Sequence, residues 1–224
     1  MMEIQNSSME THPYRPFVPE GAGKLVLGSI PPWRFTFADS PAENRLKALK
    51  DGDIDFYYGS RSNRFWMIFS AVFKAGKLDS AEKIKVLLRR EKIAMSDVVH
   101  RCRRIPARSA LDQNLRDIQF NHGLREILAK NKSIKEILFT SSFVERIFYR
   151  SFSAAAEKDI SRKCFILPDD GRRIRTAVLY SPSNMALRGI RMSKAFKLRS
   201  SQASSNYTAN DFRIEQYRKF FTAG

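Results

Sequence analysis

The most specific chemical signal in the sequence is the segment 56–66, which reads FYYGSRSNRFW. The amide of Asn63 can accept a hydrogen bond from water and donate one to a bound group, so it could hold both in line for reaction. Asn63 is also placed to cap a helix that begins near Phe65, and the two roles are compatible because a helix N-terminus presents N–H donors. Tyr57 and Tyr58, taken alone, are ordinary core aromatics. Asn63 is therefore the candidate catalytic residue.

Two loops are further candidates, because each follows an expected strand. Residues 28–32 could present backbone N–H groups to an anion, since a glycine lets a ligand approach the backbone closely. Residues 181–188 combine hydroxyls that could bind a phosphate with a proline that stiffens the turn. A loop between a strand and a helix can contain Ser-Pro-Ser for structural reasons alone, so the second loop is weak evidence by itself.

The charge of the chain indicates a polyanionic partner. Forty Lys and Arg against 23 Asp and Glu give a net charge of +17, and nucleic acid is the commonest partner of such proteins. Residues 171–200 contain eight Lys or Arg and no acid, which favours a concentrated binding surface over a solvated basic face. A membrane partner is not expected, because the chain has neither a long apolar run nor a basic amphipathic helix with an aromatic face.

Other classes of function lack the residues they need. Cys102 and Cys164 cannot form a disulfide framework or hold an iron–sulfur cluster alone, and the three histidines are scattered. His100 with Cys102 is not a zinc site, and neither a Walker loop nor GxGxxG occurs, so no metal and no cofactor are expected. The absence of an apolar leader in the N-terminal residues predicts a cytoplasmic protein, associated with the nucleoid if the source is bacterial. We expect a monomer.

The pattern of apolar residues predicts an α/β fold. Strands are expected at 24–27, 93–99, 134–140 and 176–180, and helices from Asn63, at 81–90, at 124–130, after Ser141 and Ser142, and at 211–222. A short helix is expected at 43–50 and a loop at 101–115. Strands that alternate with helices predict a three-layer α/β/α sandwich with a central four-stranded parallel sheet. We expect an irregular tail at 1–20 and a single domain at 21–224.

This fold predicts where the candidate segments meet. Ligands of parallel sheets bind outside the carboxyl ends of the strands. The loops 28–32 and 181–188 both follow strand ends, so they should converge in one cleft. Asp97, at the end of the second strand, could bind water in that cleft, although capping a turn is the simpler role.

Three segments in order, 25–32, 56–66 and 180–186, resemble the uracil-DNA glycosylase superfamily. The likeness is strongest to the hypoxanthine-DNA glycosylase branch, and next to the mismatch-specific uracil/thymine glycosylases. That branch shows a Gly-Ser-Phe-Pro turn, an aromatic-Tyr-Gly segment ending in Asn-Arg-Phe-Trp, and a late Pro-Ser loop. The likeness runs from Lys24 to about Arg191, and the middle motif is its specific part.

The chain departs from better-known relatives at two catalytic positions. Ile30 stands where the mismatch-specific enzymes have a catalytic Asn. The Asp-Pro-Tyr-His motif of the classical uracil-DNA glycosylases has no match here, and Ser181 stands where those enzymes have a His. The hypoxanthine branch also has an apolar residue at the Ile30 position, which is why the likeness to that branch is strongest.

The resemblance implies a monofunctional DNA glycosylase of base excision repair. Such an enzyme flips a damaged or deaminated base, such as uracil or hypoxanthine, out of single- or double-stranded DNA and hydrolyses its N-glycosidic bond. Asn63 is the implied catalytic residue, and no lysine is placed to form a Schiff base. The residues implied for the base pocket, where Tyr58 would stack on the base, are Gly28, Ser29, Ile30, Pro31 and Tyr58. The residues implied for DNA binding are Arg64, Ser181, Pro182, Ser183, Asn184, Met185, Arg188 and Arg191, with Met185 or Leu187 as a wedge.

Two other functions stay open. The missing Asn and His favour a non-catalytic DNA-binding member of the same fold that recognises a modified base. A basic RNA-binding protein is less favoured, because neither an RRM nor a KH signature occurs.

Overall fold

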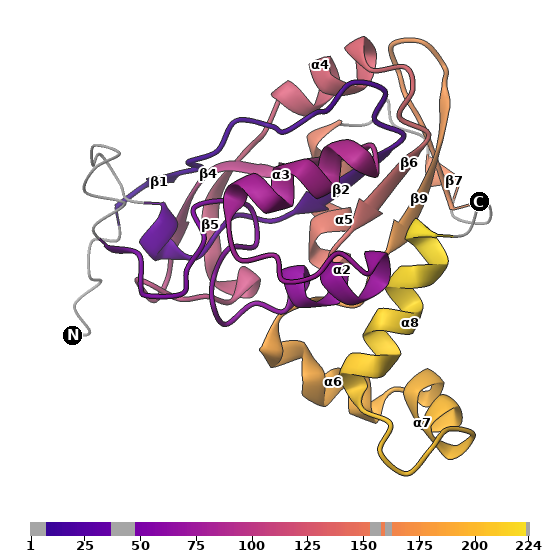
Figure 1. The fold of residues 1–224 in the computed structure, drawn as a ribbon. Helices are drawn as coiled ribbons and strands as arrows, with labels where there is room; N and C mark the ends of the chain where they lie inside the picture. The colour runs from indigo at the N-terminus through magenta and orange to yellow at the C-terminus, as the bar shows by residue number, and fades with distance from the viewer. Residues whose placement is uncertain (1–7, 37–47, 153–157, 160–162, 223–224) are drawn as a thin grey trace.

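The computed structural model describes residues 8–36, 48–152, 158–159 and 163–222. Its central sheet has the strand order β3-β2-β6-β9-β8-β7 (Figure 1). The bounds are β3 (Ile93–Asp97), β2 (Lys24–Gly28), β6 (Glu136–Phe139), β9 (Arg173–Val178), β8 (Cys164–Ile166) and β7 (Lys158–Asp159).

The first four strands are parallel, which confirms the predicted core of the fold. The sheet is nevertheless larger than the predicted four strands, because β8 and β7 add to its edge in antiparallel orientation. These two strands have three and two residues, too few for an alternating pattern to be recognised.

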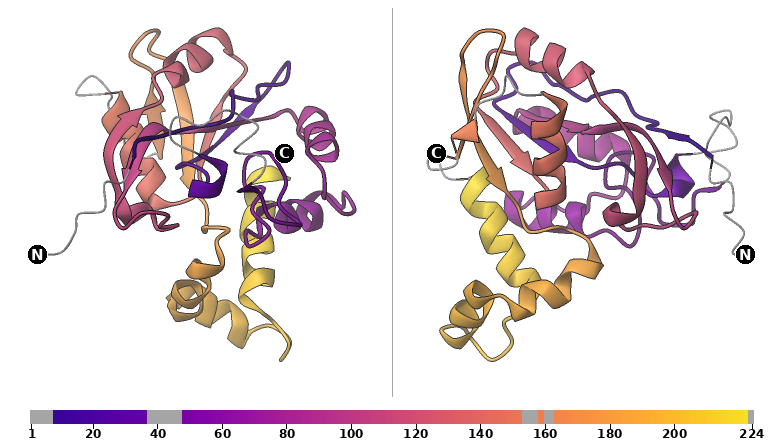
Figure 2. Two further views of the ribbon diagram at one scale, coloured as in Figure 1. Left: turned by 90° about the vertical axis from the view of Figure 1, so that its left-hand side faces the viewer. Right: turned by 180° about the vertical axis from the view of Figure 1, so that it is seen from behind.

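Both faces of the sheet are covered by helices, as Figures 1 and 2 show. Leu25 and Leu27 of β2 pack in one core with residues of α4 (Gly123–Lys130) and α5 (Ser142–Ser151). Val26, between them, packs in the other core with residues of α2 (Phe65–Phe73), α3 (Ala81–Arg90) and α8 (Ala209–Phe221). Successive side chains of a strand point to opposite faces, so a central strand covered on both sides must be continuously apolar.

Local capping signals place several helices correctly. The hydroxyl of Ser80 accepts a hydrogen bond from the backbone N–H of Lys83, and the hydroxyl of Ser141 accepts one from Val144. Helix α8 begins before the predicted Asp211, because Thr208 and Asp211 form a capping box at its start. The helix predicted at 43–50 lies largely outside the described residues.

A second, antiparallel sheet was not predicted. It consists of β1 (Glu10–Thr11), β4 (Val99–Arg104) and β5 (Leu115–Phe120) in the order β1-β4-β5. The strand predicted at 93–99 therefore ends at Asp97, and β4 continues into residues predicted as a loop. Irregular register between β4 and β5 breaks the alternation that would have indicated strands.

The described part of the predicted tail, residues 8–20, is more ordered than expected. It contributes β1, and Phe17 pairs with Met95 in a β-bridge. The ion pair of Glu10 with Arg104, at 2.8 Å, adds a buried contact between this segment and β4.

The C-terminal helices form a small extension. Helices α6 (Leu187–Met192) and α7 (Lys194–Ser201) lie below the body of the molecule in Figures 1 and 2. They share with α8 a separate apolar cluster around Ile190, Ala209 and Phe212. None of the helices in the described ranges has the length and apolar character that crossing a membrane requires.

Candidate functional site

A cleft of about 410 Å³ opens at the carboxyl ends of the parallel strands. Residues of both loops, 28–32 and 181–188, line it, so their predicted convergence is confirmed. Its walls bring together residues from widely separated segments of the chain. Those with polar side chains are Ser29, Tyr58, Ser60, Ser62, Asn63, Asp97, Arg104, Asp112, Thr140, Ser141, Ser181 and Ser183.

Gly28 has a structural reason to be glycine. It is paired with Asp97 in the parallel register of β2 and β3. A Cβ at Gly28 would collide with the hydroxyl of Tyr58 and with Oδ1 of Asp97. Gly28 was predicted to allow a ligand close to the backbone, and in the structure it is these two side chains that approach it.

Tyr58 is held in a fixed position beside the cleft. Its backbone is left-handed, with φ at 55°, which is uncommon for a residue other than glycine. One face of its ring stacks on Phe65, with centroids 4.2 Å apart, and its hydroxyl donates to Oγ1 of Thr140 at 3.1 Å. Burial, with the nearby charge of Asp97, raises the pKa of Tyr58, which keeps the phenol neutral.

The segment around Tyr58 can take this course because of its neighbours. A Cβ at Gly59 would overlap the backbone carbonyl of Ile54, so only glycine fits there. The indole N–H of Trp66 donates to the carbonyl oxygen of Tyr57 at 2.8 Å. Part of the FYYGSRSNRFW pattern is therefore required by the turn itself.

Asn63 lines the cleft and lies just before helix α2. Its Oδ1 accepts a hydrogen bond from the backbone N–H of Phe65, at 2.9 Å, where α2 begins. The N-cap of α2 is Arg64, so the prediction that Asn63 is the N-cap is wrong by one residue, although Asn63 still accepts from the first N–H of the helix. Because Oδ1 already has this partner, the amide NH₂ is the part of Asn63 best placed to act on a ligand.

The loop 181–188 is anchored by a residue that the sequence did not reveal. Arg213, on α8, is fully buried and donates to the carbonyl oxygens of Pro182 at 3.1 Å and Ser183 at 3.0 Å. Burial lowers the pKa of Arg213. An arginine among the aromatic residues of a C-terminal helix was the one available signal for this role.

The same loop carries an exposed apolar tip. Met185 is 74% exposed at the rim of the cleft, and its backbone N–H donates to the hydroxyl of Ser183 at 3.2 Å. Leu187, the other predicted wedge, instead packs against the cluster of α6 and α8. Between these two, only Met185 has a side chain that is largely exposed.

The predicted basic residues fall into two groups in space. Arg64 is exposed next to the loop, with its Nε 3.3 Å from Oδ1 of Asn184, and Arg188 and Arg191 are exposed on α6. The arginines at 172–175 lie at the amino end of β9, the opposite end of the strand from the loop. Arg172 there donates to the carbonyl oxygen of Leu128, and Arg175 is paired with Glu136.

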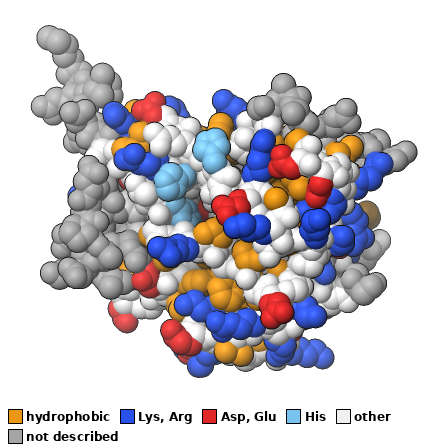
Figure 3. Space-filling view, turned by 90° about the horizontal axis from the view of Figure 1, so that it is seen from above, with side chains coloured by type: hydrophobic (Ala, Val, Ile, Leu, Met, Phe, Trp, Pro, Cys, Tyr) orange, Lys and Arg blue, Asp and Glu red, His pale blue; other side chains and the backbone are white. Residues whose placement is uncertain are grey.

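The sequence suggested that the basic stretch 171–200 forms one surface. This prediction is wrong, because its residues lie at two separate places. A strand of six residues advances about 3.3 Å per residue, which separates its two ends widely. Figure 3 shows a face on which Lys and Arg are scattered with acidic side chains among them. The positive charge is thus not confined to the cleft.

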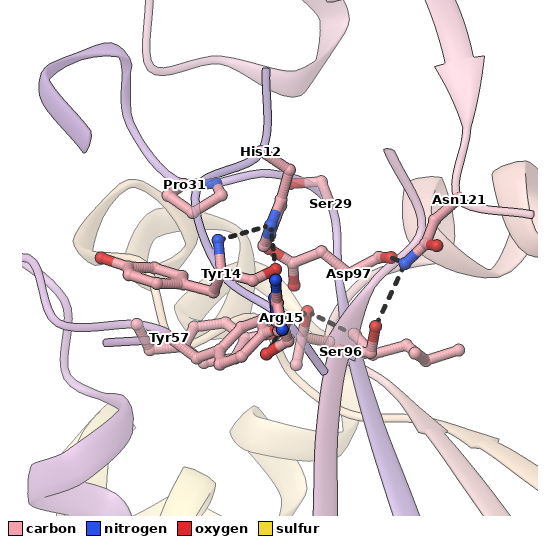
Figure 4. A network of polar contacts seen from close by, with 12 residues as sticks. His12, Tyr14, Arg15, Ser29, Pro31, Tyr57, Ser96, Asp97 and Asn121 are labelled. Atoms are coloured by element: carbon pink, nitrogen blue, oxygen red, sulfur yellow. Dashed lines mark hydrogen bonds and ion pairs between the residues drawn. The ribbon is translucent and has the colours of Figure 1, made fainter. Parts of the chain in front are cut away.

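The floor of the cleft contains a hydrogen-bonded pair that was not predicted. Oδ2 of Asp97 lies 2.9 Å from Nε2 of His12, and the two side chains are 5% and 7% exposed (Figure 4). The amide of Asn121 donates to the backbone carbonyl of Asp97 at 2.9 Å. The sequence places His12 in a segment expected to be irregular, so only the folded chain reveals the pair.

A second carboxyl group lines the cleft. Ser29 donates through its hydroxyl to Oδ1 of Asp112 at 2.7 Å. Burial raises the pKa of Asp112; the charge of Asp97 acts in the same direction, whereas the Ser29 hydrogen bond and Arg104 oppose it. The cleft thus has two carboxyl groups in different environments.

A largely buried ion pair connects the segment after the loop 28–32 to the segment that contains Ser60. Arg34, just after the loop 28–32, makes a bidentate ion pair with Asp53, at 2.6 and 2.7 Å, and also donates to the hydroxyl of Ser60 at 2.7 Å. Burial alone would raise the pKa of Asp53, but Arg34 and two backbone N–H groups outweigh it, and the net pKa is lowered.

Comparison with solved structures finds a similar fold in a protein from Methanosarcina acetivorans, determined by solution NMR and described as a "putative Uracil DNA glycosylase". The two sequences are 17% identical, and the match covers 92% of this chain and 99% of the other, with a TM-score of 0.51. No protein-family model and no curated protein matches the sequence. At this identity the likeness establishes the fold, a mostly parallel sheet flanked by helices.

Proposed function

We propose that the protein is a monofunctional DNA glycosylase of base excision repair, most similar to the hypoxanthine-DNA glycosylases. The observation that carries this proposal is the single cleft shared by Asn63, Tyr58 and the loop 181–188, at the carboxyl ends of the strands. It is the cleft of a fold similar to that of a uracil DNA glycosylase-like protein. The net charge of +17 supports a nucleic-acid partner.

In this proposal the cleft receives a base that has left the duplex. A stacked base cannot be cut from its sugar, so the nucleotide must rotate out of the helix. Met185, exposed at the rim, enters the gap that the base leaves. Tyr58 provides an aromatic contact for the flipped base, and its stack on Phe65 holds the ring in place before the base arrives.

The chemical step needs stabilisation of opposite charges. The base leaves as an anion, and the backbone N–H groups of Ser29 and Ile30 can donate to it. The amide NH₂ of Asn63 can bind the departing base or the sugar, because the backbone N–H of Phe65 occupies Oδ1. A water molecule then adds its oxygen to the sugar carbon from which the base departed and releases a proton to solvent, and the base anion takes up a proton from solvent.

Phosphate contacts hold the strand across the rim. Arg64, Arg188 and Arg191 are exposed on this side and can bind phosphates without breaking an ion pair that the structure describes. The hydroxyls of Ser181 and Ser183 and the amide of Asn184 are the neutral partners in the same loop. The positions of these groups depend on Arg213, which holds the loop by donating to the carbonyl oxygens of Pro182 and Ser183.

The alternative is a non-catalytic reader of modified bases. The specific observation in its favour is Ile30, which lines the cleft with an apolar side chain at a position where related enzymes have a catalytic amide. Such a protein would flip and bind the base without releasing it.

A single assay separates the two. Oligonucleotides that carry uracil, hypoxanthine or xanthine, single- and double-stranded, are incubated with the wild-type protein and with Asn63→Ala, and free base is measured by chromatography. Release by the wild type and its loss in Asn63→Ala support the glycosylase. Tight binding of a modified base with no release by the wild type would instead establish the reader.

A further inference from the structure

The hairpin of β4 and β5 forms a part of the cleft's rim that the proposed function does not use. Its tip, residues 105–114, lines the cleft with Leu111 and Asp112. The tip contacts the loop after β2, because Asp112 accepts a hydrogen bond from Ser29. The loop 181–188 instead contacts the start of α2. The tip and the loop 181–188 therefore border the cleft beside different segments of its wall.

The tip presents apolar side chains that do not pack in the core. Ile105 is 49% exposed and Leu111 is 37% exposed. Neither belongs to an apolar cluster of the described residues. Single exposed apolar residues are common on protein surfaces, but Leu111 shares its cleft with Met185, the exposed residue of the loop 181–188. Two separate parts of the rim thus carry an exposed apolar side chain.

Hydrogen bonds hold the tip in one conformation. Arg104, which is 2% exposed, donates to the carbonyl oxygens of Ser109 at 2.8 Å and Pro31 at 2.6 Å. The hydroxyl of Ser109 accepts from the backbone N–H of Leu111 at 3.2 Å and from the amide of Asn114 at 2.8 Å. A surface that is ordered before its ligand arrives loses less conformational entropy on binding.

The loop 181–188 is held in the same way. Arg213 is fully buried and donates to two carbonyl oxygens of that loop, as Arg104 does to one carbonyl oxygen of the tip and one of the loop after β2. The tip therefore has the two features on which the DNA-binding assignment of the loop 181–188 depends, a fixed backbone and an exposed apolar side chain.

The tip also carries an exposed positive charge. Arg108 is exposed, and its guanidinium lies over the ring of Trp33, 4.7 Å from the centroid. Among the described residues, Arg108 makes no ion pair with an acid. The one acid of the tip, Asp112, is turned inward to the hydroxyl of Ser29. A cation beside exposed apolar side chains matches DNA, which offers phosphates and the faces of bases.

Duplex DNA offers a second strand to this side of the cleft. In the proposed function, Arg64 and the loop 181–188 hold the strand that carries the flipped nucleotide. The complementary strand keeps a base that has lost its partner, so this base is open to contact. An apolar tip gains free energy by covering such a base, and Arg108 can bind a phosphate of the same strand. Single-stranded DNA lacks this second strand.

We propose that the tip of the β4–β5 hairpin is a second DNA-binding surface, which contacts the strand opposite the flipped nucleotide and makes the protein prefer duplex to single-stranded DNA. The inference rests on the proposed function only in that a nucleotide is flipped into the cleft. It holds for an enzyme and for a non-catalytic reader, because it concerns binding and not the release of the base.

Binding to uncleavable oligonucleotides tests the inference. A 2′-fluoroarabino-uridine, which resists glycosidic cleavage, is placed in an oligonucleotide that is used single-stranded and in duplex. Affinities are measured by fluorescence anisotropy for the wild type, Leu111→Ala, Arg108→Gln and Arg64→Ala. Val86→Ala is the matched control, because Val86 is an aliphatic residue of α3 that is 62% exposed and does not line the cleft.

We expect the wild type to bind the duplex more tightly than the single strand. Leu111→Ala should lower affinity for the duplex about fivefold to tenfold, because apolar groups leave a contact, and should leave affinity for the single strand unchanged. Arg108→Gln should flatten the slope of log K against log salt by about 0.9 for the duplex alone. Arg64→Ala should weaken both forms, since both contain the strand that Arg64 holds. Val86→Ala should change neither.

A cross-linking experiment identifies the contacted strand directly. A photoreactive benzophenone amino acid replaces Leu111, and the two strands of the duplex carry different fluorophores. Irradiation should join the protein to the complementary strand.

Each outcome decides the inference. Equal losses of affinity for single strand and duplex in Leu111→Ala, or cross-linking only to the strand with the flipped nucleotide, overturn the assignment to the complementary strand. Unchanged affinity for both forms in Leu111→Ala and Arg108→Gln overturns the binding surface altogether. Failure of the proposed function looks different: no base is released from cleavable oligonucleotides, whatever the ratio of duplex to single-strand affinity is.

Discussion

Asn63 and Ser183 face each other in an isolated antiparallel β-bridge, which joins the start of α2 to the loop that follows β9. The backbone N–H of Arg64 continues this contact by donating to the carbonyl oxygen of Pro182 at 3.2 Å. The segment of the candidate catalytic amide and the candidate DNA-binding loop are therefore held together by backbone contacts. A change in either segment should therefore shift the other.

Replacing Asn63 should affect catalysis and stability separately. Asn63→Ala removes one oriented donor and should slow single-turnover excision by about 10²-fold or more. It also removes the acceptor of the Phe65 N–H bond, which should lower the free energy of unfolding by about 1 kcal/mol. Excision rates and urea denaturation measure the two effects.

Asn63→Asp is the matched control. It keeps an oxygen for the N–H of Phe65 but loses the amide donor, so stability should be retained while excision changes. If Asn63→Ala excises the best substrate at the wild-type rate, Asn63 is not the catalytic residue, and the reaction depends on other groups of the cleft.

Removing the ring of Tyr58 should weaken capture of the flipped base. Tyr58→Ala deletes an aromatic contact, and such contacts are worth roughly 1–3 kcal/mol per base. Affinity for an oligonucleotide with a flipped, uncleavable base should fall accordingly, whereas affinity for undamaged duplex should stay nearly the same. Equal losses on both ligands would mean that the substitution disturbs the fold and not base capture. Because Tyr58 stacks on Phe65, its removal can also disturb the packing of the fold. A circular dichroism spectrum of Tyr58→Ala that differs from the wild-type spectrum would reveal such a disturbance.

The exposed arginines of α6 should contribute to the salt dependence of DNA binding. Replacing Arg188 and Arg191 by Ala should weaken binding to all sequences and flatten the slope of log K against log salt by about 0.9 for each lost phosphate contact. Arg175→Ala is the matched control, because Arg175 is paired with Glu136 at the amino end of β9. If Arg175→Ala lowers the slope as much as the double variant does, the DNA does not lie across α6.

How far the sequence predicts this structure depends on the distance over which each signal acts. The run Leu25-Val26-Leu27 predicts a central strand because burial on both faces requires continuous apolar residues. The serines at 141 and 142 predict a helix start because a cap depends on a hydrogen bond that spans only three residues. The strands β7 and β8 are too short to carry such a signal.

The parts of the site that were missed depend on contacts between distant segments. His12 meets Asp97 only because β1 and the residues after it pack against β3 and β4. Arg213 supports Pro182 from a helix near the C-terminus. The arginines at 172–175 were grouped with Arg188 by their closeness in sequence, but β9 carries them to its opposite end. Periodicity and capping cannot report such contacts, since they describe neighbours along the chain.

The two carboxyl groups Asp112 and Asp53 should give opposite dependences of stability on pH. Burial raises the pKa of Asp112 in the folded state above its unfolded value, so its ionisation opposes folding at neutral pH. This penalty disappears as the pH falls through the folded pKa and the group becomes protonated. Asp112→Asn keeps an oxygen for Ser29 and should therefore raise the free energy of unfolding at pH 7, with little change in strong acid.

For Asp53 the sign is reversed. Its pKa in the folded state is lowered by the ion pair with Arg34 and by backbone N–H donors, so its ionised form stabilises the fold. That contribution is complete above the unfolded pKa and is lost as the pH falls through the folded pKa. Asp53→Asn should lower the free energy of unfolding at pH 7, and the difference from wild type should shrink toward low pH. Urea denaturation of both variants between pH 2 and pH 7, the range in which carboxyl groups titrate, measures these differences. Parallel curves for Asp112→Asn and Asp53→Asn would contradict the opposite electrostatic environments that the structure gives to the two groups.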